Sequence, residues 1–404
     1  MYGLTVSIRS SSRGGNAATA ASWLMAVAGL ALAAAPTHAQ VIQSQAHDFT
    51  VEIVADGFEN PWSIAFLPEG DILVTERPGR LRIVRDGELL PDPVGGTPPA
   101  RVAGQGGLME VALHPDFESN RLVYLSYAKG NADNSQSTTA VLRGRLENDS
   151  LTDVEEIFEA KAWSERSGHY GAKLAFDADG YLFITVGDRM APPQGDLEAH
   201  PAQNPMNHQG TILRLHDDGS VPADNPFVGR SDALPEIWSY GHRNPQSLAI
   251  HPETGEVWAT EHGPQGGDEL NLSRPGRNYG WPVIGYGVNY RSGLAIHSTP
   301  HREGMEQPAL FWVPSIGASG LAVYDGDAFP MWKGNLFAGG LSADHQRLSR
   351  IWLNEQGGVA HREPLLGGDL RIRDVRQGPD GYIYLAVDNR VGLPTPLVRL
   401  VPAD

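Results

Sequence analysis

The sequence predicts an all-β protein, a six-bladed β-propeller whose blades are four-stranded antiparallel sheets. One phrase, two apolar strands around a turn that contains Pro, Asp or Gly, occurs six times between residues 63 and 389. Apolar alternation between turn signals is typical of β-strands, and a repeat of roughly 60 residues with several strands per unit is typical of a propeller. The 47 Gly and 30 Pro residues also favour many turns over long helices.

The repeats can be followed along the chain, and each is expected to supply two strands of one blade. They span residues 63–76, 110–127, 173–188, 247–262, 320–341 and 374–389, of which the fifth is divergent. Further strands are predicted at 81–87, 141–146, 211–219, 348–353 and 397–401. Residues 49–56 precede the first repeat and can add a strand to the last blade, which would close the ring. A β-sandwich is the alternative fold, but it would not repeat one hairpin phrase six times.

The N-terminal 39 residues are predicted to be a secretory signal peptide. Arg9 and Arg13 precede an apolar run at residues 23–35, and the small residues that follow suit cleavage after Ala39. An uncleaved anchor is the alternative, which the shortness of the run disfavours. We therefore expect a periplasmic or secreted protein, without stable membrane insertion, in which residues 40–404 form a single propeller domain.

Charge and cysteine content exclude several classes of function. The formal net charge of the 404 residues is −17, so no basic field exists to attract a nucleic acid. Cysteine is absent, which excludes disulfides, thiol nucleophiles and thiolate metal ligands. Any metal must therefore have oxygen or nitrogen ligands, and arginines clustered on so acidic a protein suggest an anionic ligand.

Five stretches depart from the repeat and are candidates for chemistry. Residues 104–109, 167–171, 241–246 and 370–374 lie just before the first strand of a repeat, and residues 260–282 follow a hairpin. Equivalent positions in different blades converge on one face of a propeller, so we expect these stretches to meet at one end of the channel. The stretch 260–282 is expected to be an irregular loop between blades. His114 and His251 fall in the turn of the repeat and are predicted to be turn residues.

Charged side chains in these stretches suggest two kinds of site. His169 stands between glycines that give its backbone freedom to expose the ring, and imidazole can take a proton near neutral pH; a structural histidine is the alternative. Arg371 and Arg373 alternate along a predicted strand, so both project to the same side. They form either a solvated edge or a paired clamp for carboxylates. Arg243 adds a third cationic position.

Together these motifs resemble the soluble pyrroloquinoline-quinone (PQQ) dehydrogenases of the glucose/sorbosone dehydrogenase family, and within it the aldose sugar dehydrogenases. The resemblance covers residues 50–400. It implies oxidation of aldose sugars at the anomeric carbon to the lactone, in which a general base takes the hydroxyl proton and a hydride passes to a calcium-bound quinone. It also implies an external electron acceptor (a quinone, a cytochrome or a dye), and it is compatible with a homodimer.

The resemblance also assigns roles to individual residues. His169 matches the general base, and Arg243 matches the arginine that polarises the reacting quinone oxygen. Contacts with the cofactor are implied for Gln105, Arg243, Asn244, Gln246, Arg371, Arg373 and Asp388. The main-chain carbonyls of Gly263 and Pro264 match the ligands of the cofactor-bound calcium, and Glu269 with the carbonyl of Tyr279 matches a second, structural calcium. A pair of solvated acids in a polar loop is the alternative for Asp268 and Glu269.

Three places differ from known members of the family. Ala172 and Lys173 stand where the family usually has Gly and Arg. Unlike the glucose-specific branch, residues 341–343 lack a lysine that contacts the cofactor and residues 313–315 lack aromatic residues over the substrate. These differences favour a broad range of aldoses over strict use of glucose. Two other functions stay open: a metal-dependent sugar lactonase, which would need carboxylates converging on a metal, and a non-catalytic sugar-binding propeller, which would be expected to lose His169 or the arginines.

Overall fold

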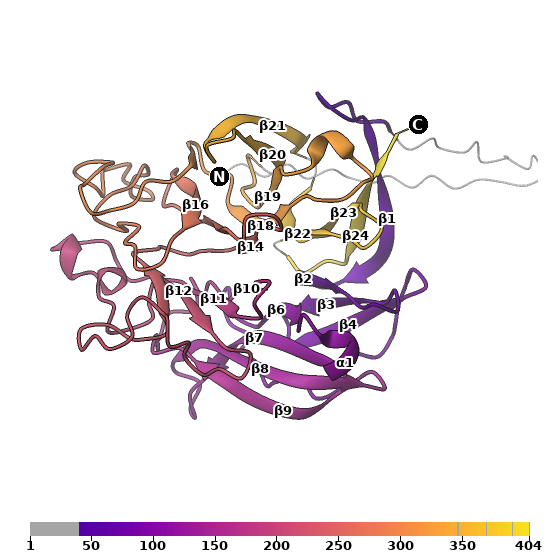
Figure 1. The fold of residues 1–404 in the computed structure, drawn as a ribbon, viewed down its shortest axis with the longest axis horizontal. Coiled ribbons are helices and arrows are strands. Elements are labelled where there is room, and N and C mark those ends of the chain that lie inside the picture. The colour runs from indigo at the N-terminus through magenta and orange to yellow at the C-terminus, as the bar shows by residue number, and fades with distance from the viewer. Residues whose placement is uncertain (1–39, 346, 369, 390, 404) are drawn as a thin grey trace, which may run out of the picture. The chain divides into compact units, whose positions relative to one another are not determined.

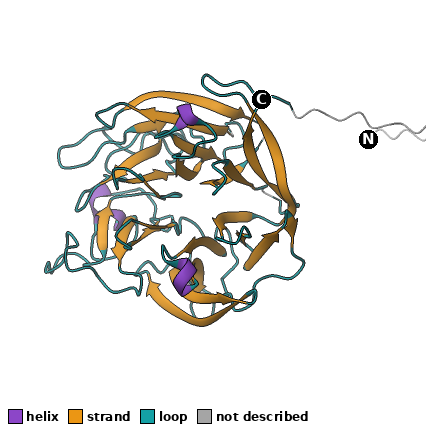
Figure 2. Ribbon diagram, turned by 45° about the vertical axis from the view of Figure 1, so that its right-hand side comes forward, coloured by secondary structure: helices purple, strands orange, loops and turns teal. Residues whose placement is uncertain are grey.

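The computed structural model describes residues 40–403 except 346, 369 and 390. It consists of six antiparallel sheets of four strands, arranged in a ring (Figures 1 and 2), which confirms the predicted six-bladed propeller. The predicted signal peptide, residues 1–39, lies outside the described residues. In the part of the chain that the structure describes, no helix is both long enough and apolar enough to cross a membrane.

Five blades are built from four consecutive strands each. Blade 1 holds β2 (Pro61–Phe66), β3 (Ile72–Glu76), β4 (Arg80–Arg85) and β5 (Glu88–Leu89). Blade 2 holds β6 (Leu108–Leu113), β7 (Leu122–Gly130), β8 (Ser137–Glu147) and β9 (Ser150–Glu159). Blade 3 holds β10 (Leu174–Phe176), β11 (Leu182–Val186), β12 (Thr211–Leu215) and β13 (Ile237–Tyr240). Blade 4 holds β14 (Ala249–Ile250), β15 (Val257–Glu261), β16 (Asp268–Ser273) and β17 (Leu310–Trp312). Blade 5 holds β18 (Ala318–Val323), β19 (Leu336–Gly340), β20 (Arg347–Leu353) and β21 (Val359–Gly367).

The sixth blade closes the ring with strands from both ends of the described chain. It combines β22 (Ile372–Gln377), β23 (Ile383–Val387) and β24 (Thr395–Pro402) with the early strand β1 (Phe49–Phe58). Strand β1 pairs with β24 from Phe49 opposite Pro402 to Phe58 opposite Thr395, which confirms the strand predicted at 49–56. The first strands β2, β6, β10, β14, β18 and β22 contact one another in turn around the ring.

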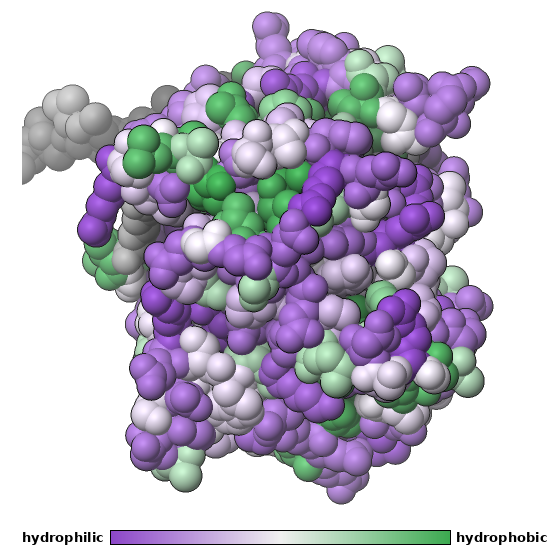
Figure 3. All heavy atoms as spheres, turned by 90° about the vertical axis from the view of Figure 1, so that its left-hand side faces the viewer, coloured by the Kyte–Doolittle hydropathy of each residue, from purple (hydrophilic) through white to green (hydrophobic). Residues whose placement is uncertain are grey.

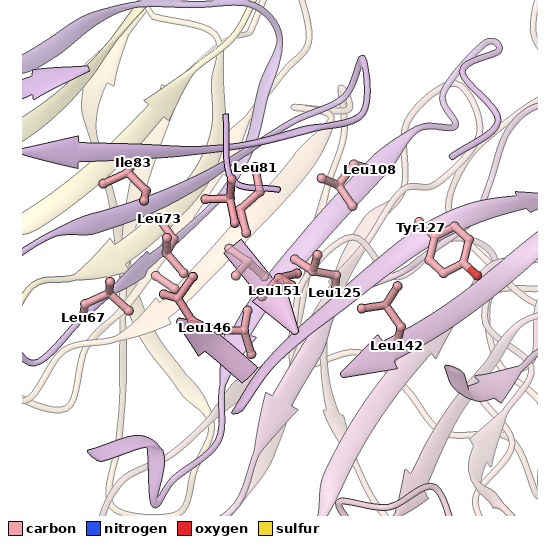
Figure 4. Packing of buried hydrophobic residues seen from close by; sticks show 14 of the residues in the cluster. Leu67, Leu73, Leu81, Ile83, Leu108, Leu125, Tyr127, Leu142, Leu146 and Leu151 are labelled. Carbon is pink, nitrogen blue, oxygen red and sulfur yellow. The ribbon is translucent and has the colours of Figure 1, made fainter. Parts of the chain in front are cut away.

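The hydrophobic core lies between neighbouring blades. The second strands β3, β11, β15, β19 and β23 are buried along their whole length because a blade packs on each of their faces. Between blades 1 and 2, Leu73 and Leu81 pack against Leu108 and Leu125, and none of the four is exposed (Figure 4). Burial of each such leucine contributes about 1.5–3 kcal/mol, so the stacked blades hold the loops at their ends in fixed positions.

The turns of the repeat contain the two histidines predicted there. The Nδ1 atom of His114 accepts from the Asp116 N–H over 3.0 Å, just before the short helix α1 (Phe117–Asn120). The Nδ1 atom of His251 accepts from the N–H groups of Glu253 and Thr254 at 3.3 and 3.4 Å. Both rings therefore stabilise turn backbone, as predicted.

The stretch 260–282 is not a loop between blades, so that prediction is wrong. Asp268–Ser273 is strand β16, whose Glu269 lies opposite Glu261 of β15. Residues 262–267 are therefore the turn between the second and third strands of one blade. The flanking Gly and Pro residues made a six-residue strand with alternating apolar positions look like a loop.

Seen from the side that carries the long loops, the surface is mostly hydrophilic, with apolar residues gathered in its upper half (Figure 3).

Candidate active site

A cavity of about 680 Å³ opens where the five unusual stretches meet. Residues from every stretch line it, and they include Gln105, Tyr170, Gln246, Gly263, Pro264, Arg371 and Arg373. The stretches belong to five different parts of the chain, and the ring of blades alone brings them together. The predicted convergence is thus confirmed, and the volume lies in the usual range for a site that binds a small molecule.

His169 is not itself among the residues that line this cavity, but its neighbour Tyr170 and its hydrogen-bond partner Gln105 are. The His169 backbone has a conformation that few residues adopt. Its φ is +50°, in the left-handed region where a side chain is strained. The side-chain Oε1 of Gln105 accepts from the His169 N–H at 2.8 Å, and the Nδ1 atom of His169 lies 2.6 Å from Asp188 Oδ1. Asp188 therefore holds the ring, and Gln105 holds the backbone that carries it. None of the described residues hydrogen bonds to its Nε2 atom.

The pKa shifts of His169 and Asp188 indicate the protonation state of the imidazole ring. Burial would raise the pKa of Asp188, but His169 and Arg243 outweigh it, so the pKa is lowered and the group is a carboxylate. A carboxylate accepts hydrogen bonds, so the proton of a neutral His169 ring sits on Nδ1 and the lone pair on Nε2. Burial lowers the pKa of His169, aided by Arg243 and opposed by Asp188. The ring is therefore neutral at pH 7 and can accept a proton at Nε2.

Arg243 is buried behind the cavity and is held from two sides. Its backbone N–H donates to Glu261 Oε2 at 2.6 Å. Its Nη1 atom donates to the carbonyl oxygens of His262 and Gly263 at 3.0 and 2.6 Å. The main chain that borders the cavity is thus in direct contact with a cation.

Arg371 and Arg373 face the cavity as a pair and share one carboxylate. Both guanidinium groups contact Oδ2 of Asp388, and Nη1 of Arg373 also donates to Gln246 Oε1 at 3.2 Å. Burial, with Arg371 nearby, lowers the pKa of Arg373 to about 10. The group stays charged at pH 7, but the shift indicates that one carboxylate does not fully offset the positive charge. Of the two alternatives for Arg371 and Arg373, a clamp that binds a further anion therefore fits this arrangement better than a solvated edge does.

Several buried donors near the cavity lack acceptors. Nε of Arg243, Nε of Arg373 and Nδ2 of Asn244 are shielded from solvent and find no hydrogen-bond partner among the described residues. Such groups normally have partners. Asn244 is fully buried, and its Oδ1 accepts from the Gly171 N–H at 3.2 Å and from Gln246 Nε2 at 3.3 Å. The donor set therefore fits an anionic ligand rich in acceptor oxygens, such as a tricarboxylate quinone.

A second cavity, of about 20 Å³, lies on the other side of the segment 262–264 and has room for about one water or ion. Gly263, Pro264, Glu261, Glu269 and Tyr279 line it. Burial raises the pKa of Glu269 well above its usual value, and the neighbouring Glu261 carboxylate adds to the rise. A cation would relieve both effects. Among the described residues no group of three or more His, Asp or Glu side chains could hold a metal, so main-chain carbonyls would have to complete either site.

Sequence reasoning missed three residues of this site. Asp188 is the last residue of the predicted repeat 173–188, two residues after strand β11, so it was assigned to the repeat and its contact with His169 was not predicted. Trp281 donates from Nε1 to Asp188 Oδ2 at 2.8 Å, a contact that no local pattern indicates. Tyr290 is an aromatic residue that lines the cavity and is 61% exposed, and it lies in a loop that no motif singled out.

Ala172 and Lys173, which replace the usual Gly and Arg, both pack against Trp62, a residue that lines the cavity. Ala172 adopts φ +70°, where glycine would be unstrained, but its methyl group packs in a small core with Trp62 and Tyr170. The Nζ atom of Lys173 lies 2.8 Å from both Glu110 Oε2 and Asp374 Oδ1 and 4.6 Å from the centre of the Trp62 ring. Lys173 thus belongs to a buried ion network under the floor of the cavity.

Comparison with known proteins agrees with this geometry. The family model described as Glucose / Sorbosone dehydrogenase matches residues 58–399. The aldose sugar dehydrogenase YliI of Escherichia coli is 40% identical over 350 residues, which are 85% of this chain and 91% of that protein. A glucose dehydrogenase crystal structure is 45% identical, with a TM-score of 0.80 over 88% of this chain and 100% of that one. The PQQ-bound aldose sugar dehydrogenase of Streptomyces coelicolor is 27% identical, with a TM-score of 0.68 over 87% of this chain and 98% of that one.

The propeller, its arginine-lined cavity and these relatives define an oxidoreductase of the β-propeller class. Within that class, the chain belongs to the glucose/sorbosone dehydrogenase family.

Proposed function

We propose that this protein is a PQQ- and calcium-dependent aldose dehydrogenase that oxidises the anomeric carbon of the sugar to a lactone. The observation that carries the proposal is the juxtaposition of a neutral, oriented base with a cluster of cationic donors at one cavity. His169 presents a free Nε2, and Arg373 presents a buried donor without a partner among the described residues. A non-catalytic propeller has no use for a strained, neutral histidine held by a carboxylate.

The donors at the cavity would hold the cofactor carboxylates. Arg371 and Arg373 offer a paired fork that matches carboxylate geometry, and the amide of Gln246 lies between Arg373 and Asn244. Bound there, PQQ would supply a quinone that takes up two electrons as a hydride. Arg243 would face the quinone from behind the cavity wall and favour negative charge there.

The carbonyls of Gly263 and Pro264 would hold the cofactor-bound calcium, because hard cations take oxygen ligands that include backbone carbonyls. Both residues line the larger cavity. Glu269 and the carbonyl of Tyr279 would hold a second calcium in the smaller cavity. The raised pKa of Glu269 supports a cation there.

The proton of the sugar hydroxyl would pass to Nε2 of His169. Asp188 would stabilise the imidazolium that results, since its carboxylate lies 2.6 Å from Nδ1. Gln105 fixes the backbone of the base through the His169 N–H. An external acceptor would take up the two electrons of the reaction. Cleavage of the predicted signal peptide would place this chemistry in the periplasm or outside the cell.

A metal-dependent lactonase is disfavoured because it needs side-chain carboxylates converging on a metal in the channel. At the larger cavity the structure instead offers arginines, and of the two carboxylates that line it, Asp344 and Asp388, Asp388 is already shared by two arginines.

Reconstitution tests the proposal. The mature protein is mixed with PQQ and calcium, and dye reduction is followed with several aldoses and, separately, with aldonolactones as hydrolase substrates. We expect the absorption of PQQ to change on binding and the dye to be reduced with more than one aldose. Lactone hydrolysis without dye reduction would favour the lactonase, and sugar binding without either reaction would favour the binding propeller.

A further inference from the structure

The indole of Trp281 contacts both sides of the proposed catalytic machinery. Its Nε1–H donates to Oδ2 of Asp188 at 2.8 Å, while Oδ1 of the same carboxylate lies 2.6 Å from Nδ1 of His169. The guanidinium carbon of Arg243 lies 5.2 Å from the centre of the indole ring, which is within cation–π range. The indole of Trp281 therefore contacts both the Asp188 carboxylate, which holds the His169 ring, and the Arg243 guanidinium.

We propose that Trp281 is a positioning residue for the reaction, and that its indole holds the Asp188 carboxylate and the Arg243 guanidinium in one fixed relation, so that His169 and Arg243 act on the same substrate. The inference rests on the proposed roles of His169 and Arg243. It adds a residue to which neither the family resemblance nor the repeat assigned a role.

The indole can orient others because its own position is fixed. Its backbone N–H donates to the Gly241 carbonyl at 2.8 Å, and its carbonyl accepts from Gln203 Nε2 at 2.7 Å. The rings of His200 and His297 meet its faces and edges at centroid distances of 6.2 and 5.6 Å. A side chain locked in this way transmits its geometry to the group that it hydrogen bonds.

The charges around His169 and Asp188 give the direction in which the pKa of His169 changes when the indole donor is removed. His169 faces Asp188, Arg243 and Arg189, and Asp188 also faces His200. The Asp188 carboxylate accepts from Trp281, from the Met190 N–H at 2.8 Å and from His169. Loss of the indole donor leaves more of the negative charge to be stabilised by His169. The protonated ring is then favoured, so its pKa rises.

Trp281→Phe tests this contact because it removes the N–H and keeps an aromatic ring. Trp332→Phe is the matched control: Trp332 is fully buried in the core around blade 5, and its Nε1 has no partner among the described residues. Both variants lose the same volume and one indole N–H, but only the first loses a hydrogen bond. Each is reconstituted with PQQ and calcium, and kcat, KM for glucose, the pH profile and the PQQ affinity are measured.

For Trp281→Phe we expect kcat to fall roughly tenfold or more, the size of one hydrogen bond to a charged group. The acid limb of kcat/KM should move to higher pH, with PQQ affinity unchanged, while Trp332→Phe should match the wild type. If Trp281→Phe keeps the wild-type kcat and acid limb, the inference is wrong even if its melting temperature falls. An inactive wild type would instead contradict the proposed function itself.

Should Trp281→Phe not fold, the unaltered protein answers the same question. With ¹⁵N-labelled tryptophan in the PQQ- and calcium-loaded protein, one indole N–H signal should shift with pH at the midpoint of the acid limb, because the charge of His169 changes the shared carboxylate. If no indole signal shifts across that limb, Trp281 is not coupled to the base.

Discussion

Nη1 of Arg243 donates to the carbonyl oxygen of Gly263 at 2.6 Å, the oxygen that the family resemblance assigns to calcium. A guanidinium and a divalent cation repel each other when they share an oxygen, by about 4 kcal/mol per pair of unit charges at 4 Å and an effective dielectric constant near 20. We therefore expect Arg243 and calcium to compete for this carbonyl in the absence of cofactor, and an anionic cofactor to relieve the competition by offering the guanidinium another partner.

The first prediction concerns the metal. Arg243→Met should raise the calcium affinity of the cofactor-free protein by about tenfold or more, since it removes the competing charge and keeps most of the side-chain volume. Calorimetric titration of calcium into the two proteins measures the effect. Arg274→Met, at an exposed arginine whose nearest carboxylate is 4.0 Å away, is the control and should leave the affinity unchanged. Equal or weaker binding by Arg243→Met would contradict the competition.

The second prediction concerns pH. The proposed base, His169, must be neutral to accept a proton, and burial lowers its pKa below its usual 6.5. Turnover should therefore be full at pH 7 and should fall only as the pH drops through that lowered value. Asp188 opposes the lowering, so Asp188→Ala should move the acid limb to still lower pH.

The same Asp188→Ala variant should reduce kcat by roughly 100-fold, because the ring loses its orientation and the tautomer is no longer fixed. Rate–pH profiles of wild type and variant measure both effects. This shift is opposite to that expected for Trp281→Phe. An acid limb that stays in place would show that the limb does not report His169.

The third prediction concerns the cofactor clamp. Arg373→Met should weaken PQQ binding by about tenfold or more, the value of a charge-assisted hydrogen bond. An absorbance titration with PQQ measures the affinity. Arg399→Met removes a surface arginine that pairs with Glu52 and Asp380 and should have no effect. Unchanged PQQ affinity in Arg373→Met would remove this residue from the clamp.

The fourth prediction concerns stability. Lys173→Met leaves the buried carboxylates of Glu110 and Asp374 with Arg376 as their one charged partner among the described residues, so the free energy of unfolding should fall by about 3 kcal/mol or more. Lys129→Met removes an ion pair with Glu156 and Glu159 at a side chain that is 31% exposed, which should cost about 1 kcal/mol at most. Urea unfolding of both variants compares them. If the two variants lost the same free energy of unfolding, burial of the ion network around Lys173 would have no energetic consequence.

The fold could be predicted almost completely, because its information is local and repeated. The repeated hairpin sequence predicted all six blades, and the apolar pattern of residues 49–56 predicted the strand that closes the ring. The phrase did not mark outer strands such as β9, whose residues 152–156 are exposed and carry no apolar alternation. Strand β16 was mistaken for loop because glycine and proline surround it.

The site could be predicted only where it departs from the repeat. His169 and the arginines were conspicuous because nothing in the repeat explains them. Asp188 was not, since it is the last residue of a predicted repeat and polar residues are common at that position. The pairing of Lys173 with Asp374 joins residues 201 positions apart, and only the order of blades in the ring brings them together. Contacts of this kind follow from the closed ring and leave no local pattern.

The central claim is that His169 takes the proton from a sugar held against a bound quinone. Stopped-flow reduction of PQQ in the calcium-loaded protein, mixed with glucose in a single turnover, tests it most directly when wild type is compared with His169→Gln. We expect equal PQQ affinity in the two proteins and a reduction rate at least about 100-fold lower in the variant, the usual contribution of a general base. Reduction of PQQ by His169→Gln at the wild-type rate would contradict the claim.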